Sequence, residues 1–234
     1  MMNSPKSLLL LNGSPKCELS NSRVIGKFLA DKLVEKGLQS TEEFIVRATK
    51  SIEGTERLQE LTQQADIVIL TTPLYIDSLP SFTIKAMETM CEKRKENPHS
   101  KTQILVPVMN NGFPEKEHMD VALQIIQNFA EEADFQWGGK VRVGMGGALN
   151  GEPLREGKGM TGRLTRGLTL AAAALAEGNP IPFEIEVMIA KPFLPIFLVK
   201  IGMGFFGKQM WNSQAKNNLV DNRMLARPYD CSSH

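Results

Sequence analysis

Hydroxyl, amide and amino side chains follow an apolar run near the N-terminus, and together they could hold an anion. Residues 8–11 are four leucines that end at Asn12 and Gly13, and a helical pattern begins at Ser22. A strand, a loop and a helix N-terminus in this order bring unpaired backbone N–H groups and the positive end of the helix dipole together. A phosphate monoester fits such a site, and the candidate side chains are Ser14, Lys16, Ser20, Asn21 and Ser22. The plainer alternative is that Ser20 or Asn21 only caps the helix.

Two later loops bring aromatic and amide groups to the ends of predicted strands. Residues 71–80 (TTPLYIDSLP) have prolines near both ends and Tyr75 at the centre, and residues 110–115 (NNGFPE) combine two amides, a glycine and Phe113. In doubly wound sheets, ligands bind outside the carboxyl ends of the strands, so we expect these loops to lie beside the first. Together, the three loops predict a flat heteroaromatic ligand with a phosphate tail.

Strands that alternate with helices must position these loops. The predicted strands are residues 7–11, 44–47, 66–71, 103–109 and 140–145, and the predicted helices are residues 22–36, 54–64, 79–95, 115–133 and 161–177. This alternation indicates βαβ units. We predict an α/β fold with a doubly wound five-stranded parallel sheet in a three-layer α/β/α sandwich. Pro107 falls inside a predicted strand and requires an irregularity there, such as a bulge.

The strand–helix alternation ends near Gly178, which predicts two parts. Residues 1–178 form the ligand-binding domain, and residues 179–234 form an apolar helical extension. Residues 188–211 are rich in apolar side chains but are interrupted by three lysines and two prolines. We expect one or two helices there, which pack on the core, form a dimer interface, cover the ligand as a lid, or contact a membrane surface.

Composition excludes several classes of protein. The 234 residues are 42% hydrophobic and 23% charged, as in ordinary globular proteins, and 27 basic residues nearly balance 26 acidic ones. General nucleic-acid binding needs a basic excess, so it is not expected. The three cysteines are far apart and form no CxxC or Cys/His cluster, so no metal site is predicted. No signal-peptide core and no apolar run of ~20 residues is found, so we expect a cytoplasmic protein with free thiols.

Three motifs resemble, in type and order, those of the NAD(P)H-dependent FMN reductase branch of the flavodoxin-like superfamily. They are LNGSPK followed by SNS, then TTPLYIDSLP, then NNGFPE. The resemblance covers residues 7–178 and implies a flavodoxin-like fold, non-covalent FMN, NADH or NADPH as reductant, and a homodimer or higher homo-oligomer. By position it implies that the first loop holds the FMN phosphate. The flavin ring would contact Pro73, Leu74, Tyr75, Ile76, Asp77, Asn110, Asn111, Gly112 and Phe113. Many relatives contain a CxxCxxC-type cluster near the first loop; only Cys17 is present here, which disfavours an iron–sulfur version.

The predicted function is that of an FMN-dependent NAD(P)H oxidoreductase. Hydride passes from nicotinamide to FMN and then to an acceptor such as a quinone, a nitro- or azo-aromatic, a flavin or a metal ion. The cofactor supplies the chemistry, so no catalytic residue is predicted. One alternative is a non-enzymatic flavodoxin-type electron carrier, against which the near-neutral charge and the extension weigh. Another is a flavin-free binding protein on the same fold. The sequence leaves the acceptor and the choice of NADH or NADPH open.

Three further features receive plainer interpretations. Residues 157–162 match GxGxxG but do not follow the first strand, so they are expected to be a loop before a helix. His118 could protonate a reduced acceptor, although a solvated or capping role is simpler. Cys17 lies in the first loop near a helix N-terminus, which can lower a thiol pKa, but it is interpreted as an incidental small residue.

Overall fold

The structure is a computed structural model that describes residues 5–96, 102–157, 159–194 and 212–213. Its sheet is parallel, with the strand order β2-β1-β3-β4-β5, and β6 also pairs with β4. The strands are β1 (Ser7–Asn12), β2 (Gln39–Phe44), β3 (Ile67–Pro73), β4 (Ile104–Asn110), β5 (Gln136–Trp137) and β6 (Val141–Val143). The predicted doubly wound parallel sheet is therefore confirmed.

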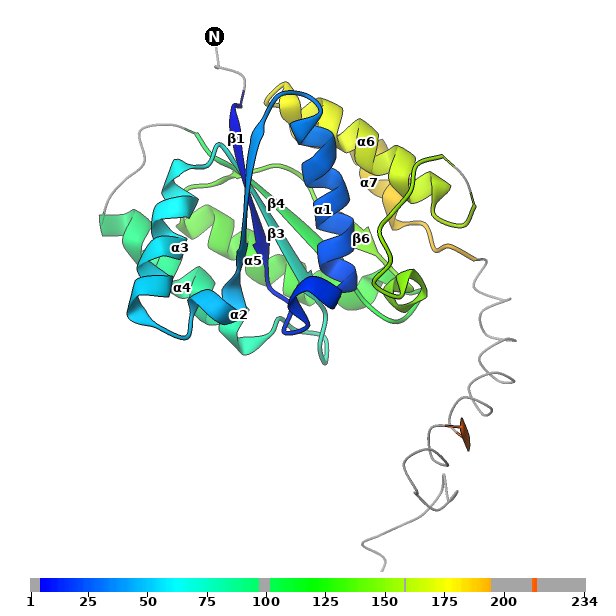
Figure 1. Cartoon of the computed structure of the whole chain (residues 1–234), viewed down its shortest axis with the longest axis horizontal. Coiled ribbons are helices and arrows are strands. Elements are labelled where there is room, and N and C mark those ends of the chain that lie inside the picture. The colour runs from blue at the N-terminus through cyan, green and yellow to red at the C-terminus, as the bar shows by residue number, and fades with distance from the viewer. Residues whose placement is uncertain (1–4, 97–101, 158, 195–211, 214–234) are drawn as a thin grey trace, which may run out of the picture. The chain divides into compact units, whose positions relative to one another are not determined.

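Helices separate the successive strands from β1 to β5, β6 follows β5 directly, and helices cover the sheet on two sides (Figure 1). The α-helices are α1 (Asn21–Val34), α2 (Ile45–Ala48), α3 (Ile52–Gln64), α4 (Ser81–Glu96), α5 (Asp120–Glu132), α6 (Gly162–Ala176) and α7 (Phe183–Ala190). The short 3-10 helices are η1 (Cys17–Leu19), η2 (Lys116–Met119) and η3 (Gly146–Leu149).

Side chains that alternate along the strands divide the core into two layers. On one face, Leu8 and Leu10 of β1 and Ile69 of β3 belong to a buried cluster with α1, α6 and α7. On the other face, Leu9 and Leu11 belong to a cluster with α2, α3, α4 and α5. Successive residues of a strand point to opposite faces, so a strand that is apolar at every position can serve both clusters. This arrangement is the predicted three-layer sandwich.

The fifth position of the sheet is divided between two short strands. β5 pairs with Ile104 and Leu105, and β6 pairs with residues 108–110 of β4. Pro107 lies opposite the break between them, and its register with Leu70 of β3 is continuous, so the expected bulge is not needed. Leu105 accepts a hydrogen bond from Gly138 on the β5 side, and alternation directs Pro107 to that side as well. The missing N–H of Pro107 therefore faces the interruption and removes no hydrogen bond from the ladder.

The second strand was predicted wrongly. It runs from Gln39 to Phe44 rather than over residues 44–47, and Ile45–Ala48 is the short helix α2. The strand lies at the sheet edge, where its side chains are exposed or half-buried, so it lacks the apolar pattern of a buried strand. Ile45 and Ala48 are the buried members of the next segment, and their spacing of three is helical.

The described beginning of the C-terminal extension packs on the sandwich. Helix α7 contacts α6 and β6, and Ile189 belongs to the same core cluster as α1. A compact unit therefore reaches Phe193. Most of the apolar run, residues 195–211, lies outside the described residues, as does Cys231; Cys17 and Cys91 have free thiols. In the part of the chain that the structure describes, no helix is long and apolar enough to cross a membrane.

Candidate functional site

The loop after β1 is folded by its own hydrogen bonds. Ser14 N–H donates to Asn12 Oδ1 at 3.0 Å, Asn12 Nδ2 donates to the Cys17 carbonyl at 3.2 Å, and Lys16 N–H donates to Ser14 Oγ at 3.3 Å. Gly13 lies against β3, where a Cβ atom would be 3.0 Å from the Thr71 carbonyl oxygen. The loop is therefore held on the sheet at a position that only glycine fits without displacement.

Helix α1 begins directly after this loop, and its first turn presents free donors. Ser20 is the N-cap: its hydroxyl oxygen accepts from Arg23 N–H at 3.1 Å and lies 2.8 Å from Ser22 Oγ. Both hydroxyls are buried. The N–H groups of Asn21 and Ser22 have no partner among the described residues. Ser20 therefore caps the helix, as the plainer alternative predicts, and the turn still retains two backbone donors.

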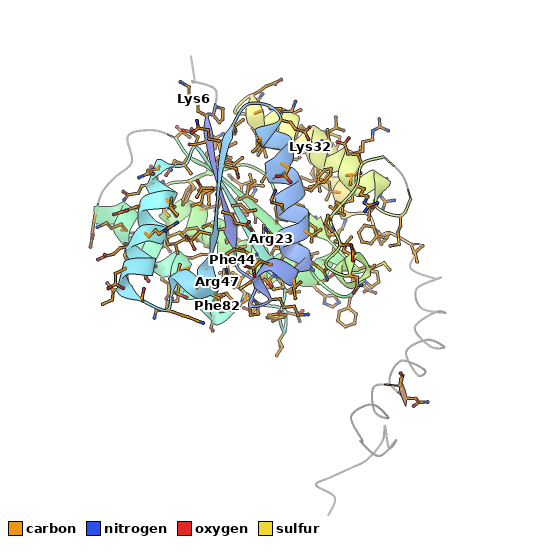
Figure 2. The ribbon with its side chains drawn as sticks, viewed as in Figure 1. Lys6, Arg23, Lys32, Phe44, Arg47 and Phe82 are labelled. Carbon is orange, nitrogen blue, oxygen red and sulfur yellow. The ribbon has the colours of Figure 1, made fainter. Side chains whose placement is uncertain are left out.

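Two arginines lie near the loop after β1, and each is neutralised by a glutamate. Arg23 forms a bidentate pair with Glu42 of β2 at 2.6 and 2.8 Å, and Arg47 of α2 pairs with Glu18 at 2.8 Å. Both guanidinium groups lie over the ring of Phe44, and the three side chains are grouped at the loop end of the sheet (Figure 2). The hydrogen bond to Glu42 raises the pKa of Arg23, and a backbone hydrogen bond and then Arg47 lower the pKa of Glu18.

The loop after β3 contains a tight hairpin. Tyr75 and Ser78 exchange backbone hydrogen bonds of 3.0 and 3.1 Å, and Ile76 and Asp77 between them both have positive φ, at 51° and 55°. Two positive φ angles are typical of a type I′ turn, which favours Asn and Gly over a β-branched residue. Ile76 is fully exposed at the tip. The N–H groups of Leu74 and Tyr75 are used within the protein and are not available to a ligand.

The loop after β4 contributes buried amides. Asn110 and Asn111 are 7% and 5% exposed, and their Oδ1 atoms have no hydrogen-bond partner within the described structure. Asn111 Nδ2 donates to the Glu115 carbonyl at 2.8 Å, which fixes that side chain. Buried polar atoms without partners are costly, so these two acceptor oxygens indicate that a ligand or water completes them.

These three loops surround one cavity of about 190 Å³, which we call the cradle. Eleven of the fourteen predicted residues line it: Ser14, Lys16, Ser20, Asn21, Ser22, Pro73, Leu74, Tyr75, Asn110, Asn111 and Gly112. Ile76, Asp77 and Phe113 lie outside the lining. Lys16 is the only charged residue of the lining. Neutral donors, a helix N-terminus and one lysine form a surface suited to a phosphate.

Asp77 and Phe113, two of the three residues outside the cradle lining, instead lie close to His118. His118 Nδ1 lies 3.6 Å from Asp77 Oδ1, and the rings of His118 and Phe113 are 5.9 Å apart. Ile76 and Phe113 are both exposed. Both interpretations of His118, the simpler one of a solvated or capping residue and the alternative of a proton donor, stay predictions.

Sequence reasoning missed a fourth loop, which follows β6. Gly147 lines the cradle, and Gly151 N–H donates to Asn21 Oδ1 at 2.7 Å. Gly146 lies so close to Asn110 that a Cβ atom would be 2.3 Å from Nδ2. The signal available was the density of glycine in residues 144–151 (GMGGALNG) directly after a predicted strand.

Comparisons with known proteins agree with the topology. An NADH:FMN oxidoreductase in its apo form is 12% identical with a TM-score of 0.53, and the match covers 81% of this chain and 96% of that one. The metal-soaked Flv1 flavodiiron core from Synechocystis sp. PCC6803 is 16% identical with a TM-score of 0.53, over 75% of this chain and only 36% of that protein. A flavone reductase is 8% identical with a TM-score of 0.50, over 74% and 62%. No protein-family model matches the chain, and no curated protein matches it.

At these identities the neighbours establish the fold alone. The strand order β2-β1-β3-β4-β5, with loops at the carboxyl ends of β1, β3 and β4 around one cavity, is the arrangement of flavodoxin. The chain therefore has the flavodoxin-like α/β fold that the sequence motifs predict.

Proposed function

We propose that this protein binds FMN in the cradle and acts as an FMN-dependent NAD(P)H oxidoreductase. The main support is the cradle itself, where buried hydroxyls and free backbone N–H groups surround one lysine and no carboxylate. A phosphate dianion held by such donors forms charge-assisted hydrogen bonds worth ~1.5–3 kcal/mol each. One protein with the same fold is named an NADH:FMN oxidoreductase.

The amide side fits the other part of FMN. The side-chain oxygens of Asn110 and Asn111 have no hydrogen-bond partner among the described residues. The flavin ring has an N–H group that can donate a hydrogen bond to such an oxygen. The cradle volume of about 190 Å³ is below the ~300 Å³ at which small-molecule sites begin. A ligand as large as FMN therefore extends past the rim, where Tyr75 is 43% exposed and able to contact an aromatic ring.

FMN, when bound, supplies the hydride and electron transfer between a nicotinamide nucleotide and an acceptor. The residues of this chain have the simpler tasks of holding the phosphate and orienting the ring. Because the cofactor supplies the chemistry, we assign no acid or base role to any residue of the cradle. We propose that NADH or NADPH and then a flat acceptor use the same open side in turn.

Absorbance spectroscopy tests this proposal directly. The purified protein is mixed with FMN or riboflavin, freed of excess ligand, and treated anaerobically with NADH and then NADPH. We expect FMN to be retained at least tenfold better than riboflavin and to bleach within seconds with one nucleotide. A retained flavin that stays yellow would indicate the alternative, an electron carrier that needs a separate reductase. Equal retention of FMN and riboflavin would refute the phosphate role of the cradle.

A further inference from the structure

A larger cavity lies away from the cradle, beside α6 and α7, and we call it the α6 groove. Its volume is about 710 Å³, and it shares no lining residue with the cradle. Arg163, Arg166 and Leu170 form its α6 side at helical spacings of three and four, and Met188 and Lys191 come from the end of α7. The two helices lie side by side at one edge of the molecule (Figure 1). Gly167 permits this contact, since a Cβ atom there would be 2.6 Å from Ile189 Cγ1.

The groove has basic side chains without acidic partners. Arg166 and Lys191 form no ion pair and no side-chain hydrogen bond with any residue that the structure describes. Arg163 donates from Nη2 to the carbonyls of Lys191 and Pro192 at 2.6 and 2.5 Å, which neutralises no charge and holds the guanidinium at the groove. Three cationic groups therefore face one space.

The one carboxylate in the lining is already paired. Glu156 Oε1 lies 2.6 Å from Nζ of Lys32, a residue that lies toward the end of α1 farthest from the cradle (Figure 2). The hydrogen bond from Glu156 raises the pKa of Lys32, with a second contribution from Glu35. Glu156 shares Lys32 with Glu35, which lies 2.7 Å from the same Nζ. The lining still has two guanidinium groups and one ammonium against this one carboxylate, so its net charge is positive.

Apolar side chains complete the groove. Leu170 is 39% exposed and Met188 is half-buried, and neither has a polar atom that needs a partner in water. Thr169, which also lines the groove, donates its hydroxyl to the carbonyl of Thr165 at 3.0 Å, so this hydroxyl is already used within the helix. A free phosphate would leave this apolar surface uncovered, whereas a phosphate ester with an aromatic or aliphatic body would cover it.

We propose that the α6 groove is a second binding site, for an organic phosphate whose body is apolar or aromatic. Arg166 binds the phosphate oxygens through paired N–H donors, and Arg163 adds single donors from the nitrogens that its two carbonyl contacts leave free. Lys191 adds a point charge, and Leu170 and Met188 contact the body. The site is independent of the FMN proposal, because it uses none of the cradle residues.

Backbone-amide NMR of the full chain tests the proposal, because it reads both cavities separately. The probe is 1-naphthyl phosphate, and 1-naphthol and inorganic phosphate are its two halves. We expect saturable shifts in residues 162–170 and 188–191 with 1-naphthyl phosphate, and at least tenfold weaker binding of either half. The double variant Arg166→Gln/Lys191→Gln should weaken the probe at least tenfold. It leaves Arg163 and its carbonyl contacts in place, so the helices stay packed.

The control is Lys85→Gln, which removes an exposed cation of α4 that has no partner among the described residues and lies outside both cavities. It should leave the groove shifts unchanged. Shifts confined to residues 14–22 would mean that the phosphate binds only in the cradle, which overturns this proposal and leaves the FMN proposal intact. Equal binding of 1-naphthol, or no saturable shift because another part of the chain or a second copy covers the groove, would also overturn it.

Discussion

The cradle and the α6 groove are both suited to an anion, but the protein builds them by opposite means. In the cradle, Ser20 and Ser22 are buried, and the nearby arginines Arg23 and Arg47 are neutralised by Glu42 and Glu18. In the groove, the donors are exposed cationic side chains without acidic partners. Neutral donors fixed by the backbone recognise the shape of an anion. Exposed charges attract any anion, and salt screens them over a Debye length of ~10 Å at 0.1 M.

The largest expected effect comes from Gly26, which positions α1 and hence the cradle. A Cβ atom at Gly26 would lie 2.0 Å from Thr71 Cγ2. Thr71 is fully buried and its hydroxyl donates to the Leu11 carbonyl at 3.1 Å, so its side chain is not free to rotate away. We expect Gly26→Ala to lower the free energy of unfolding by about 2 kcal/mol, net of a gain in helix propensity of ~1 kcal/mol, and to reduce FMN retention.

Urea unfolding measures this change, and Gly147→Ala is its control. Nothing lies within 4 Å of a Cβ atom at Gly147, so that variant should keep its stability within ~0.5 kcal/mol. An undiminished unfolding free energy for Gly26→Ala would show that α1 adjusts its position on the sheet. The donors of the cradle would then not be rigidly fixed by the backbone, and this contrast with the groove would be lost.

A second prediction separates capping from binding in the first turn of α1. The double variant Ser20→Ala/Ser22→Ala removes the N-cap and both buried hydroxyls, so we expect a loss of about 1 kcal/mol of stability and at least tenfold weaker FMN binding. Ser51→Ala is the matched control, because Ser51 caps α3 by accepting from Gly54 N–H at 3.0 Å, far from the cradle lining. It should lose similar stability and no FMN affinity. If the double variant and Ser51→Ala bind FMN equally well, the hydroxyls of Ser20 and Ser22 stabilise the helix and do not bind the phosphate.

The two regions also differ in how far the sequence predicts them. The cradle follows from a rule of the fold, since loops at the carboxyl ends of adjacent parallel strands must meet, and eleven of its residues could be named from motifs. Ile76 and Asp77 were expected in the cavity because they share a motif with Tyr75. The hairpin bond between Tyr75 and Ser78 directs them outward instead, and one-dimensional spacing does not reveal such a turn.

The groove could not be predicted, because it depends on the distance between two helices rather than on a strand end. The spacing of Arg163, Arg166 and Leu170 is equally typical of a solvated helix face. Only the packing of α7 on α6 brings Met188 and Lys191 opposite them. For the same reason the polar edge strand β2 was placed too late in the chain, since pairing with β1 and not hydrophobicity defines it.

A third prediction tests whether charge matters in the cradle at all. Lys16 is exposed and is the only charged lining residue, so we expect Lys16→Gln to weaken FMN binding about three- to tenfold and riboflavin binding not at all. Lys36→Gln is the control, since Lys36 is exposed just beyond the opposite end of α1. Fluorescence titration at low and high salt measures both ligands. A loss larger than a hundredfold would mean that the cradle, like the groove, depends mainly on charge.

The smallest effect concerns the rim of the cradle, at Ile76. A β-branched residue with a φ of 51° is strained by ~1–2 kcal/mol, and Asn adopts this conformation readily. We expect Ile76→Asn to raise the free energy of unfolding by about 1 kcal/mol. Val121→Asn replaces an exposed apolar residue of α5 and should give no such gain, because that residue is helical.

FMN retention of the same variant decides between the two placements of Ile76. Since Ile76 is fully exposed and lies outside the cradle lining, Ile76→Asn should retain FMN as well as the unaltered protein. If retention falls instead, the strained tip contacts the part of the ligand that extends past the rim. The strain would then have a function, as it does where unfavourable backbone angles persist at binding sites. The motif-based expectation for Ile76 would in that case be right, and the ligand-binding site would extend beyond the residues that line the cradle.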